Sequence, residues 1–456
     1  MRKIMREVFR AYDIRGVVDV DFDEEWVVVL GQALGTYFLR HGLATAVVGH
    51  DCRHSSPVYA NRIIASLAAT GMDVIQLGMV ATPIFYYATK HLQRPAGVMI
   101  TASHNPPEYN GFKIWAGNTT LYADQIQTVH DCMAANSFPA GRGLICNHDI
   151  VPAYLEELVA QCRPLARKVK VVVDGGNGSA GLVCVELLRR IGAEVVPLFC
   201  EPDGDFPNHH PDPVVEKNII ALKAAVLATG ADVGLGLDGD GDRLGVVDET
   251  GRLIYGDQLL AIYARDILNR LPQATVIGEV KCSHLLYRDI EAHGGISIMG
   301  VTGHSVMKTQ IIKTGAKLAG EMSGHMFFAD RYYGYDDGIY AALRLVELLG
   351  ADPALPLSRR LIDWPTTYAT PEIRLDCPEK VKFLVVAKVL EVFQRDYQII
   401  DVDGVRIVFD DGWGLVRASN TQPVLVLRFE AESPERLAAI RALIEEPLAA
   451  WVRDLT

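Results

Sequence analysis

A serine stands in a short polar loop directly after an apolar stretch. Gly97–Ile100 has the composition of a buried strand, and Thr101–Pro106 (TASHNP) follows it. Because small, hydroxyl and proline residues interrupt regular structure, the loop is expected to expose Ser103. A serine hydroxyl reacts only with help from a base, a metal or a cationic neighbour, and His104 and Lys113 are close along the chain. The segment predicts either a serine nucleophile or a turn whose side chains only satisfy backbone groups.

Three aspartates alternate with glycines further along the chain. Asp238, Asp240 and Asp242 lie in the segment DGDGDR between two strand-like runs. The glycines permit tight bends, so the carboxylates can converge on one hard cation, and Mg²⁺ is the expected ion. A calcium EF-hand is rejected, because its sixth position requires glycine where this chain has Arg243, and because its flanks should be helices. An acidic surface turn is disfavoured, since three carboxylates this close repel one another. Arg243 is a candidate phosphate ligand or a member of a surface ion pair.

Two more polar segments suit oxygen-rich ligands. In Gly320–His325 (GEMSGH), Glu321 and Ser323 alternate along what is expected to be an extended segment, so both point the same way, which suits adjacent sugar hydroxyls. Arg417–Gln422 (RASNTQ) combines one guanidinium, hydroxyls, an amide and turn N–H groups, which suits a single phosphate. Polar turns without a ligand explain both segments equally well from composition.

A glycine-rich segment favours a different function. Gly176–Gly181 matches G-x-G-x-x-G between a strand-like and a helix-like stretch, the context of a dinucleotide-binding loop. Gly234–Gly239 matches the same string but opens no helix, and no phosphate-binding loop of the kinase type is present. A nicotinamide-dependent oxidoreductase is therefore the main rival, although it leaves the aspartate segment unexplained.

The elements that must position these loops follow a pattern that occurs three times. A helix-like stretch ends at a glycine and a short β-rich run follows, as at the junctions of α/β units. Another β-rich run precedes each helix, so strands and helices alternate as in mixed or parallel sheets. The three copies are Ser66–Gly78, Glu186–Phe199 and Ile290–Gly300, and the preceding runs are Thr45–Gly49, Val169–Asp174 and Ala274–Val280.

The C-terminal part has a different pattern. Two helix-like stretches flank three strand-like runs: Lys380–Gln394, then Val405–Phe409, Gly414–Ala418 and Val424–Glu430, then Pro434–Glu446. The predicted fold class is α/β, with three related α/β domains containing mixed sheets and a C-terminal α+β domain around a central cleft. The expected domains are 1–150 with the serine, 151–253 with the metal site, 254–366 with the sugar site and 367–456 with the phosphate site.

Composition limits the class of protein. The chain has 456 residues, which is too long for one core. Its net charge of −12 and the lack of a Lys/Arg block argue against binding to nucleic acid or to an anionic membrane. The 8 cysteines form no C-x-x-C pair, and neither a signal peptide nor a membrane-spanning run is found. A cytoplasmic protein with small-molecule ligands is expected.

Taken in order, TASHNP, DGDGDR, GEMSGH and RASNTQ resemble the α-D-phosphohexomutase superfamily, and the resemblance begins at FRAYDIRG near the N-terminus. It implies a heart-shaped protein with four domains around a deep cleft. It also implies that Ser103 is a phosphoserine and that Mg²⁺ is held by this serine and the three aspartates. Sugar recognition is assigned to Glu321 and Ser323. Phosphate binding is assigned to Arg417, Ser419, Asn420 and Thr421.

The resemblance implies roles for further residues. Lys113 and His304 are expected in proton transfer or substrate contact. From their positions beside Ser103 and the aspartate segment, His104 and Arg243 are also expected at the reacting groups. The residues expected to line the cleft are Tyr12, Arg15, Lys281 and His325.

The GEMSGH loop resembles the phosphomannomutase/phosphoglucomutase branch. This branch, of the isomerase class, interconverts hexose 1-phosphate and hexose 6-phosphate through a hexose 1,6-bisphosphate. The expected cofactors are Mg²⁺ and glucose 1,6-bisphosphate or mannose 1,6-bisphosphate as activator. The expected partners are hexose phosphates only, with a monomer or weak homodimer.

Overall fold

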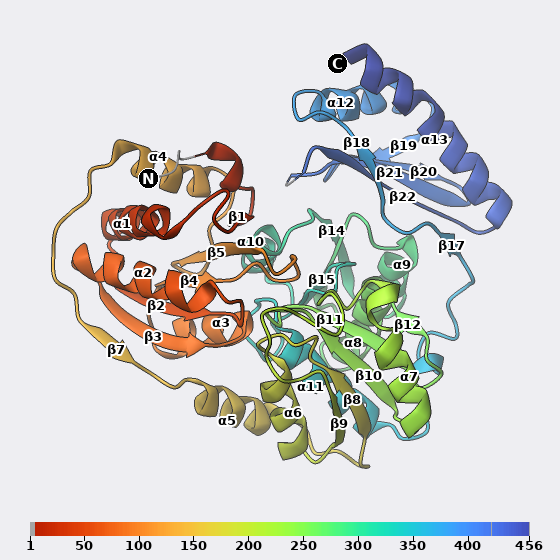
Figure 1. Cartoon of the computed structure of the whole chain (residues 1–456). Helices are drawn as coiled ribbons and strands as arrows, with labels where there is room; N and C mark the ends of the chain where they lie inside the picture. Colours follow the sequence, from red (N-terminus) through yellow and green to blue (C-terminus); the bar gives the residue numbers. More distant parts are fainter. Residues whose placement is uncertain (1–4, 421, 456) are drawn as a thin grey trace.

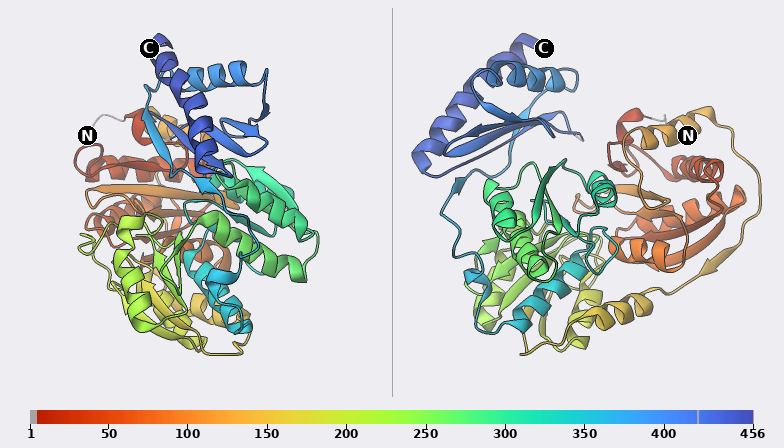
Figure 2. Two further views of the ribbon diagram at one scale, coloured as in Figure 1. Left: turned by 90° about the vertical axis from the view of Figure 1, so that its right-hand side faces the viewer. Right: turned by 180° about the vertical axis from the view of Figure 1, so that it is seen from behind.

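The computed structural model describes residues 5–420 and 422–455, which form four sheets with their helices (Figure 1). Three α/β domains pack together, and the C-terminal domain lies over the third of them (Figure 2). Among the described residues, no helix has both the length and the apolar character needed to cross a membrane. The fold class expected from the sequence is confirmed.

The first sheet has the order β1-β5-β4-β2-β3-β7, with β6 paired to β5. Strands β4, β2, β3 and β7 are parallel, with β7 at the edge, and β5 runs antiparallel to β4. The elements are η1 (Arg6–Val8), β1 (Ile14–Val17), α1 (Glu24–Arg40), β2 (Thr45–His50), α2 (Ser56–Ala69), β3 (Asp73–Met79), α3 (Thr82–His91), β4 (Ala96–Ile100), β5 (Tyr109–Ala116), β6 (Thr119–Thr120), α4 (Asp124–Ala135) and β7 (Ile145–Asn147).

The second sheet has the order β12-β11-β10-β8-β9 and the third has the order β14-β13-β15-β16. The second domain contains α5 (Val151–Gln161), β8 (Lys170–Asp174), α6 (Gly181–Arg190), β9 (Glu194–Leu198), η2 (Glu216–Asn218), α7 (Ile220–Thr229), β10 (Val233–Leu237), β11 (Leu244–Asp248) and β12 (Leu253–Ile254). Because β12 pairs with β11, the second sheet extends one residue past the expected limit at residue 253.

The third domain contains α8 (Gly256–Arg270), β13 (Thr275–Glu279), α9 (His284–Ala292), β14 (Ile296–Gly300), α10 (His304–Thr314), β15 (Leu318–Gly320), β16 (Met326–Phe328), α11 (Gly338–Ala351) and η3 (Leu357–Arg359). The expected threefold pattern is present in the structure. Gly71, Gly192 and Gly294 each follow a helix with positive φ and lead into β3, β9 and β14. In each of these domains a parallel strand ends at a polar loop and an antiparallel strand returns from it.

The C-terminal sheet is antiparallel, with the order β17-β22-β21-β20-β19 and β18 also paired to β22. Its elements are β17 (Tyr368–Ala369), β18 (Ile373–Asp376), α12 (Lys382–Phe393), β19 (Gln398–Ile400), β20 (Val405–Phe409), β21 (Gly412–Ala418), β22 (Val424–Ala431) and α13 (Pro434–Leu455). The closing helix continues past Glu446, where the sequence suggested an end. Pro447 lies inside it, and Leu448 packs into the core on the next turn.

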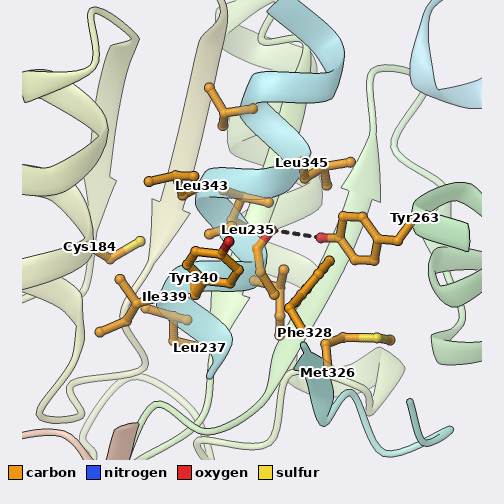
Figure 3. Packing of buried hydrophobic residues seen from close by; sticks show 14 of the residues in the cluster. Cys184, Leu235, Leu237, Tyr263, Met326, Phe328, Ile339, Tyr340, Leu343 and Leu345 are labelled. Carbon is orange, nitrogen blue, oxygen red and sulfur yellow. Dashed lines mark hydrogen bonds between the residues drawn. The ribbon is translucent and has the colours of Figure 1, made fainter. Parts of the chain in front are cut away.

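The core between the second and third domains is built around α11. This helix is buried from Gly338 to Gly350, and its two charged residues, Arg344 and Glu347, form ion pairs with Asp330 and Arg331. Figure 3 shows it between Cys184 and Leu235 of the second domain and Tyr263 and Phe328 of the third. The Tyr263 hydroxyl donates a 2.7 Å hydrogen bond to the Ala341 carbonyl, so its buried polar group is satisfied. One continuous core therefore fixes these two domains, and their loops, relative to each other.

Candidate active site

Ser103 lies in a strained loop at the end of β4, and it is buried at 3% exposure rather than exposed as expected, because the aspartate loop of the second domain covers it. Its φ of +49° falls in the left-handed region, which non-glycine residues rarely adopt. The loop is held by the buried guanidinium of Arg53, which donates hydrogen bonds to the carbonyls of Ser103 (2.8 Å), Asn105 (2.5 Å) and Pro106 (2.6 Å). Such strain persists only where the surroundings enforce it, and it is concentrated at functional sites.

The Ser103 hydroxyl faces the aspartate loop of the second domain. It donates a 2.6 Å hydrogen bond to Asp238 Oδ2, and His104 Nδ1 lies 3.1 Å from Oγ. Burial lowers the pKa of His104 well below its usual range, so the ring is neutral at neutral pH. The loops after β4 and β10 thus bring together two sequence motifs that are more than a hundred residues apart.

Asp238, Asp240 and Asp242 converge and are fully buried. Oδ1 of Asp240 and of Asp242 has no hydrogen-bond donor among the described residues, although buried carboxylate oxygens ordinarily have one. Burial and the two neighbouring carboxylates raise the pKa of Asp238 well above its usual range. Unpaired oxygens and mutual repulsion are both relieved by a hard cation, so the donor set fits Mg²⁺.

Lys113, on β5, contacts two of these carboxylates. Its ammonium donates to Asp240 Oδ2 at 2.7 Å and also to Asp242 Oδ2. Burial would raise the pKa of Asp240, but the Lys113 charge outweighs burial and lowers it. Thr82 on α3 donates to Asp240 Oδ2 as well, at 2.6 Å. Lys113 is therefore bound to the carboxylates of the candidate metal site in this structure.

The glycine segment Gly176–Gly181 packs against the aspartate loop. Ser179 N donates to the Gly239 carbonyl at 3.1 Å, and Asn177 N donates to the Phe199 carbonyl at 2.8 Å. A Cβ on Gly178 would lie 2.7 Å from the Gly239 oxygen. The N–H groups that would bind a pyrophosphate are engaged within the protein, so these glycines permit close packing of two loops. The arrangement does not favour the dinucleotide interpretation.

The GEMSGH segment is a turn between β15 and β16, which corrects the expected extended conformation. Gly324 has a φ of +90° and its N–H donates to the Glu321 carbonyl at 3.1 Å. The turn still points the two side chains together, because Ser323 Oγ donates to Glu321 Oε2 at 3.1 Å. Burial and the neighbouring Glu279 raise the pKa of Glu321.

Two histidines and Arg243 lie between the metal-site loop and this turn. Arg243 Nε donates to His325 Nε2 at 3.0 Å, and the Arg243 N–H donates to Asp238 Oδ1 at 3.2 Å. The rings of His304 and His325 stack with their centroids 5.7 Å apart. Arg243 thus connects the candidate metal site to the histidines rather than forming a surface ion pair.

Tyr12 joins three domains. Its hydroxyl donates to the Thr302 carbonyl of the third domain at 2.8 Å and accepts a 2.9 Å hydrogen bond from Asn420 Nδ2 of the C-terminal domain. Burial raises its pKa to about 12, so the hydroxyl stays protonated. Arg15, on β1, donates to Asn105 Oδ1 at 2.6 Å, and it therefore lies against the serine loop.

The C-terminal domain adds a basic group to this region. Arg417 at the end of β21 lies 3.0 Å from Asp403, and its Nε has no acceptor among the described residues. Ser419 and Asn420 follow it, whereas Thr421 lies outside the described residues. Lys281, after β13, pairs with Glu372 at 3.1 Å. The expected site residues therefore come from loops of all four domains.

Sequence reasoning missed several buried polar residues. Arg53 and its partner Asp51 follow β2, and Lys308 and Asp336 form a 2.7 Å pair beside the histidines. Asp403 accepts from the Thr302 N–H and so connects the C-terminal domain to the third. The only available signal was the position of Asp51 and Arg53 at a strand end equivalent to those of the recognised loops.

Comparison with protein families agrees with these four domains. Models described as phosphoglucomutase/phosphomannomutase alpha/beta/alpha domains I, II and III and C-terminal domain match residues 6–140, 152–251, 255–368 and 372–446. The phosphomannomutase/phosphoglucomutase of Pseudomonas aeruginosa is 45% identical over 451 residues, which cover 97% of this chain and 96% of that protein. The phosphoglucomutase of Neisseria gonorrhoeae is 42% identical over 461 residues, covering 99% and 100%.

A solved structure is also similar over its whole length. A phosphoglucomutase/phosphomannomutase family protein from Burkholderia thailandensis superimposes with a TM-score of 0.93 at 39% identity, covering 100% of this chain and 99% of that one. The likeness therefore includes the arrangement of all four domains.

Proposed function

The chain belongs to the phosphoglucomutase/phosphomannomutase family and is a phosphohexomutase, and on this premise we propose that Ser103 carries the phosphoryl group. The enzyme interconverts hexose 1-phosphate and hexose 6-phosphate. The observation that carries the proposal is the 2.6 Å hydrogen bond from Ser103 Oγ to Asp238, inside a buried triad of carboxylates from another domain. A hydroxyl at the edge of a cation site is placed for phosphoryl transfer.

The residues around Ser103 support this role. Asp238, Asp240 and Asp242 would hold Mg²⁺, which supplies neutralisation of the charge on the phosphoryl group. Phosphoryl transfer depends mainly on positioning and charge stabilisation, and Arg243 and Lys113 provide cations at this place. His104 is neutral and within 3.1 Å of Oγ, so it can exchange a proton with the serine.

The groups on the other loops suit a hexose phosphate that reacts at two positions. Arg417 with Ser419 and Asn420 would bind the phosphate that is not reacting, while Glu321 and Ser323 would bind sugar hydroxyls. Phosphoserine then gives its phosphoryl group to the free hydroxyl, and a hexose 1,6-bisphosphate forms. After this intermediate turns over in the site, its other phosphate returns to Ser103. We propose that both mannose and glucose phosphates are accepted.

The test is the conversion of mannose 1-phosphate and glucose 1-phosphate to their 6-phosphates, with Mg²⁺ and a trace of hexose 1,6-bisphosphate. We expect Ser103→Ala to lose nearly all activity toward both sugars, whereas Ser137→Ala, on an exposed serine of the same domain, keeps it. Mass spectrometry of the wild type after incubation with the bisphosphate should find one phosphate on the peptide that contains Ser103. Full turnover by Ser103→Ala would overturn the proposal.

A further inference from the structure

A buried Lys308–Asp336 pair lies behind the two stacked histidines of the site. Lys308 Nζ donates to Asp336 Oδ1 at 2.7 Å and lies 4.5 Å from the centre of the Tyr86 ring. Both members of the pair are at most 2% exposed. A buried ion pair costs free energy of desolvation unless further contacts offset it, so its presence beside a catalytic site calls for a local function.

Lys308 determines which nitrogen of His304 carries the proton. Its Nζ lies 3.1 Å from His304 Nδ1. An ammonium group only donates hydrogen bonds, so Nδ1 must be the acceptor, and the single proton of a neutral ring is then on Nε2. Burial and the Lys308 charge hold the pKa of His304 well below its usual range, so the ring is neutral. The opposite edge of the ring therefore carries an N–H donor.

Arg243 fixes the neighbouring histidine in the other tautomer. Arg243 donates to His325 Nε2 at 3.0 Å, so that nitrogen is the acceptor and a ring proton can be only on Nδ1. His325 Nδ1 lies 3.0 Å from Asp336 Oδ2, although this contact does not have the geometry of a hydrogen bond. His304 Nδ1, by contrast, lies 3.8 Å from the same oxygen, which is too long for a hydrogen bond. His304 and His325 therefore hold opposite tautomers beside the Lys308–Asp336 pair.

We infer that Lys308 is a positioning residue that, with Asp336, holds His304 in its Nε2–H tautomer and so presents a hydrogen-bond donor to an oxygen of the hexose phosphate. The inference rests on the proposed function for the identity of that ligand, but the tautomer itself does not. Histidines that act on ligands commonly have their tautomer fixed by a second residue.

The wild-type enzyme provides the first test. With histidines labelled with ¹⁵N, two-bond correlation spectra at neutral pH distinguish Nε2–H from Nδ1–H rings, and the loss of one set of signals in His304→Gln assigns His304. The inference expects the Nε2–H pattern for His304 and the Nδ1–H pattern for His325. An Nδ1–H pattern for His304 overturns it, whether or not the enzyme turns over hexose phosphates.

Lys308→Met provides the second test, because it keeps the length of the side chain and removes the donor. Asp336 is then the nearest strong acceptor to Nδ1, so the proton of His304 is expected to move to Nδ1. We expect kcat to fall by about 10- to 100-fold, the size usual for loss of a supporting contact, with KM for glucose 1-phosphate changed less than about threefold. The matched control is Lys313→Met, on an exposed position of the same helix, which should leave the spectrum and kcat unchanged.

A third variant covers the case in which Lys308→Met does not fold. Lys308→Gln retains an amide NH2 group that can donate to Nδ1, and it should restore the Nε2–H pattern and part of kcat. If Lys308→Met folds and keeps the wild-type tautomer and kcat, Lys308 is only structural and the inference is wrong. If the tautomer changes as expected but kcat does not, His304 does not donate to the substrate, and that part of the inference is overturned.

Discussion

At the scale of single residues, the serine loop depends on one buried arginine. Arg53 donates to four carbonyls of the segment from Ser103 to Tyr109 and pairs with Asp51. A planar guanidinium with five N–H groups can serve all of these acceptors, whereas a lysine ammonium has three donors in another geometry. The strained backbone of Ser103 is therefore a consequence of a residue far away in sequence.

We expect Arg53→Lys to lower kcat/KM by about 10- to 100-fold, because buried carbonyls left without a donor cost roughly 1–3 kcal/mol each. Steady-state kinetics with glucose 1-phosphate measure the effect, and calorimetry reports the accompanying loss of thermal stability. Arg62→Lys, at an exposed ion pair with Glu24, is the control and should match the wild type. Unchanged turnover in Arg53→Lys would show that the loop holds its conformation without this guanidinium.

A second residue-scale effect concerns Asp337 at the start of α11. Its carboxylate accepts from the Tyr340 N–H at 2.8 Å and from the hydroxyls of Tyr154 and Tyr332. Burial raises its pKa from 3.8 to about 6, in spite of these hydrogen bonds. The folded state therefore holds a proton that the unfolded chain releases at lower pH. The stability gained in this way is fully present below the unfolded pKa and is lost as pH rises through about 6.

We expect Asp337→Asn to remove this dependence, since the amide stays neutral and its oxygen can still cap the helix. Relative to the variant, the wild type should lose on the order of 3 kcal/mol of unfolding free energy as pH rises through this window. Urea unfolding followed by tryptophan fluorescence at a series of pH values measures the difference. A difference between the two proteins that does not change with pH would contradict the raised pKa.

At the scale of elements, the sequence predicted the loops well because each lies between two clear strands. Ser103 follows the apolar β4, and Asp238 follows the apolar β10, so the ends of the strands were recognisable. The turn at Glu321 was misjudged because alternation over three residues does not distinguish a turn from a strand, although Gly324 was a signal for the turn. Arg53 was missed because its partners are backbone carbonyls, which leave no trace in sequence spacing, so that its position at a strand end was the one signal available.

The packing of two loops makes an element-scale prediction. A Cβ at position 178 would lie 2.7 Å from the Gly239 oxygen and 3.0 Å from the Asp238 oxygen, so Gly178→Ala must shift the metal-site loop. Overpacking of this kind costs about 1–3 kcal/mol, and we expect the Mg²⁺ concentration for half-maximal activity to rise about tenfold. Measuring the activity of the wild type and of Gly178→Ala over a series of Mg²⁺ concentrations gives this half-maximal concentration.

Gly42→Ala is the comparison for this variant. Gly42 has a φ of +73° and open space around its Cβ position, so alanine there strains the backbone far from the aspartates. It should lower thermal stability without changing the Mg²⁺ requirement. Equal Mg²⁺ requirements in the two variants would show that the glycine segment does not control the metal site.

At the scale of the whole molecule, the C-terminal domain is held unequally by its neighbours. Arg406 donates to the Val280 and Cys282 carbonyls of the third domain at 2.6 and 2.8 Å and stacks on Trp413 at 3.7 Å. Toward the first domain, the C-terminal domain is joined through the exposed hydrogen bond that Asn420 donates to the Tyr12 hydroxyl. From this difference between a buried cluster on one side and an exposed hydrogen bond on the other, we expect the domain to rotate about its junction with the third domain.

This asymmetry predicts the behaviour of Tyr12→Phe. The variant loses the hydroxyl that joins Thr302 and Asn420, so the arrangement in which Arg417 faces the site is less populated before substrate arrives. Losing hydrogen bonds of about 0.5–1.5 kcal/mol should raise KM for glucose 1-phosphate about 2- to 10-fold, while kcat changes little, because bound sugar phosphate restores closure. X-ray scattering should show a larger radius of gyration for the free variant than for the free wild type, and equal values when both are saturated with ligand. If the free proteins scatter identically and KM is unchanged, Tyr12 does not help to hold the domain, and closure must depend on contacts between the ligand and Arg417 alone.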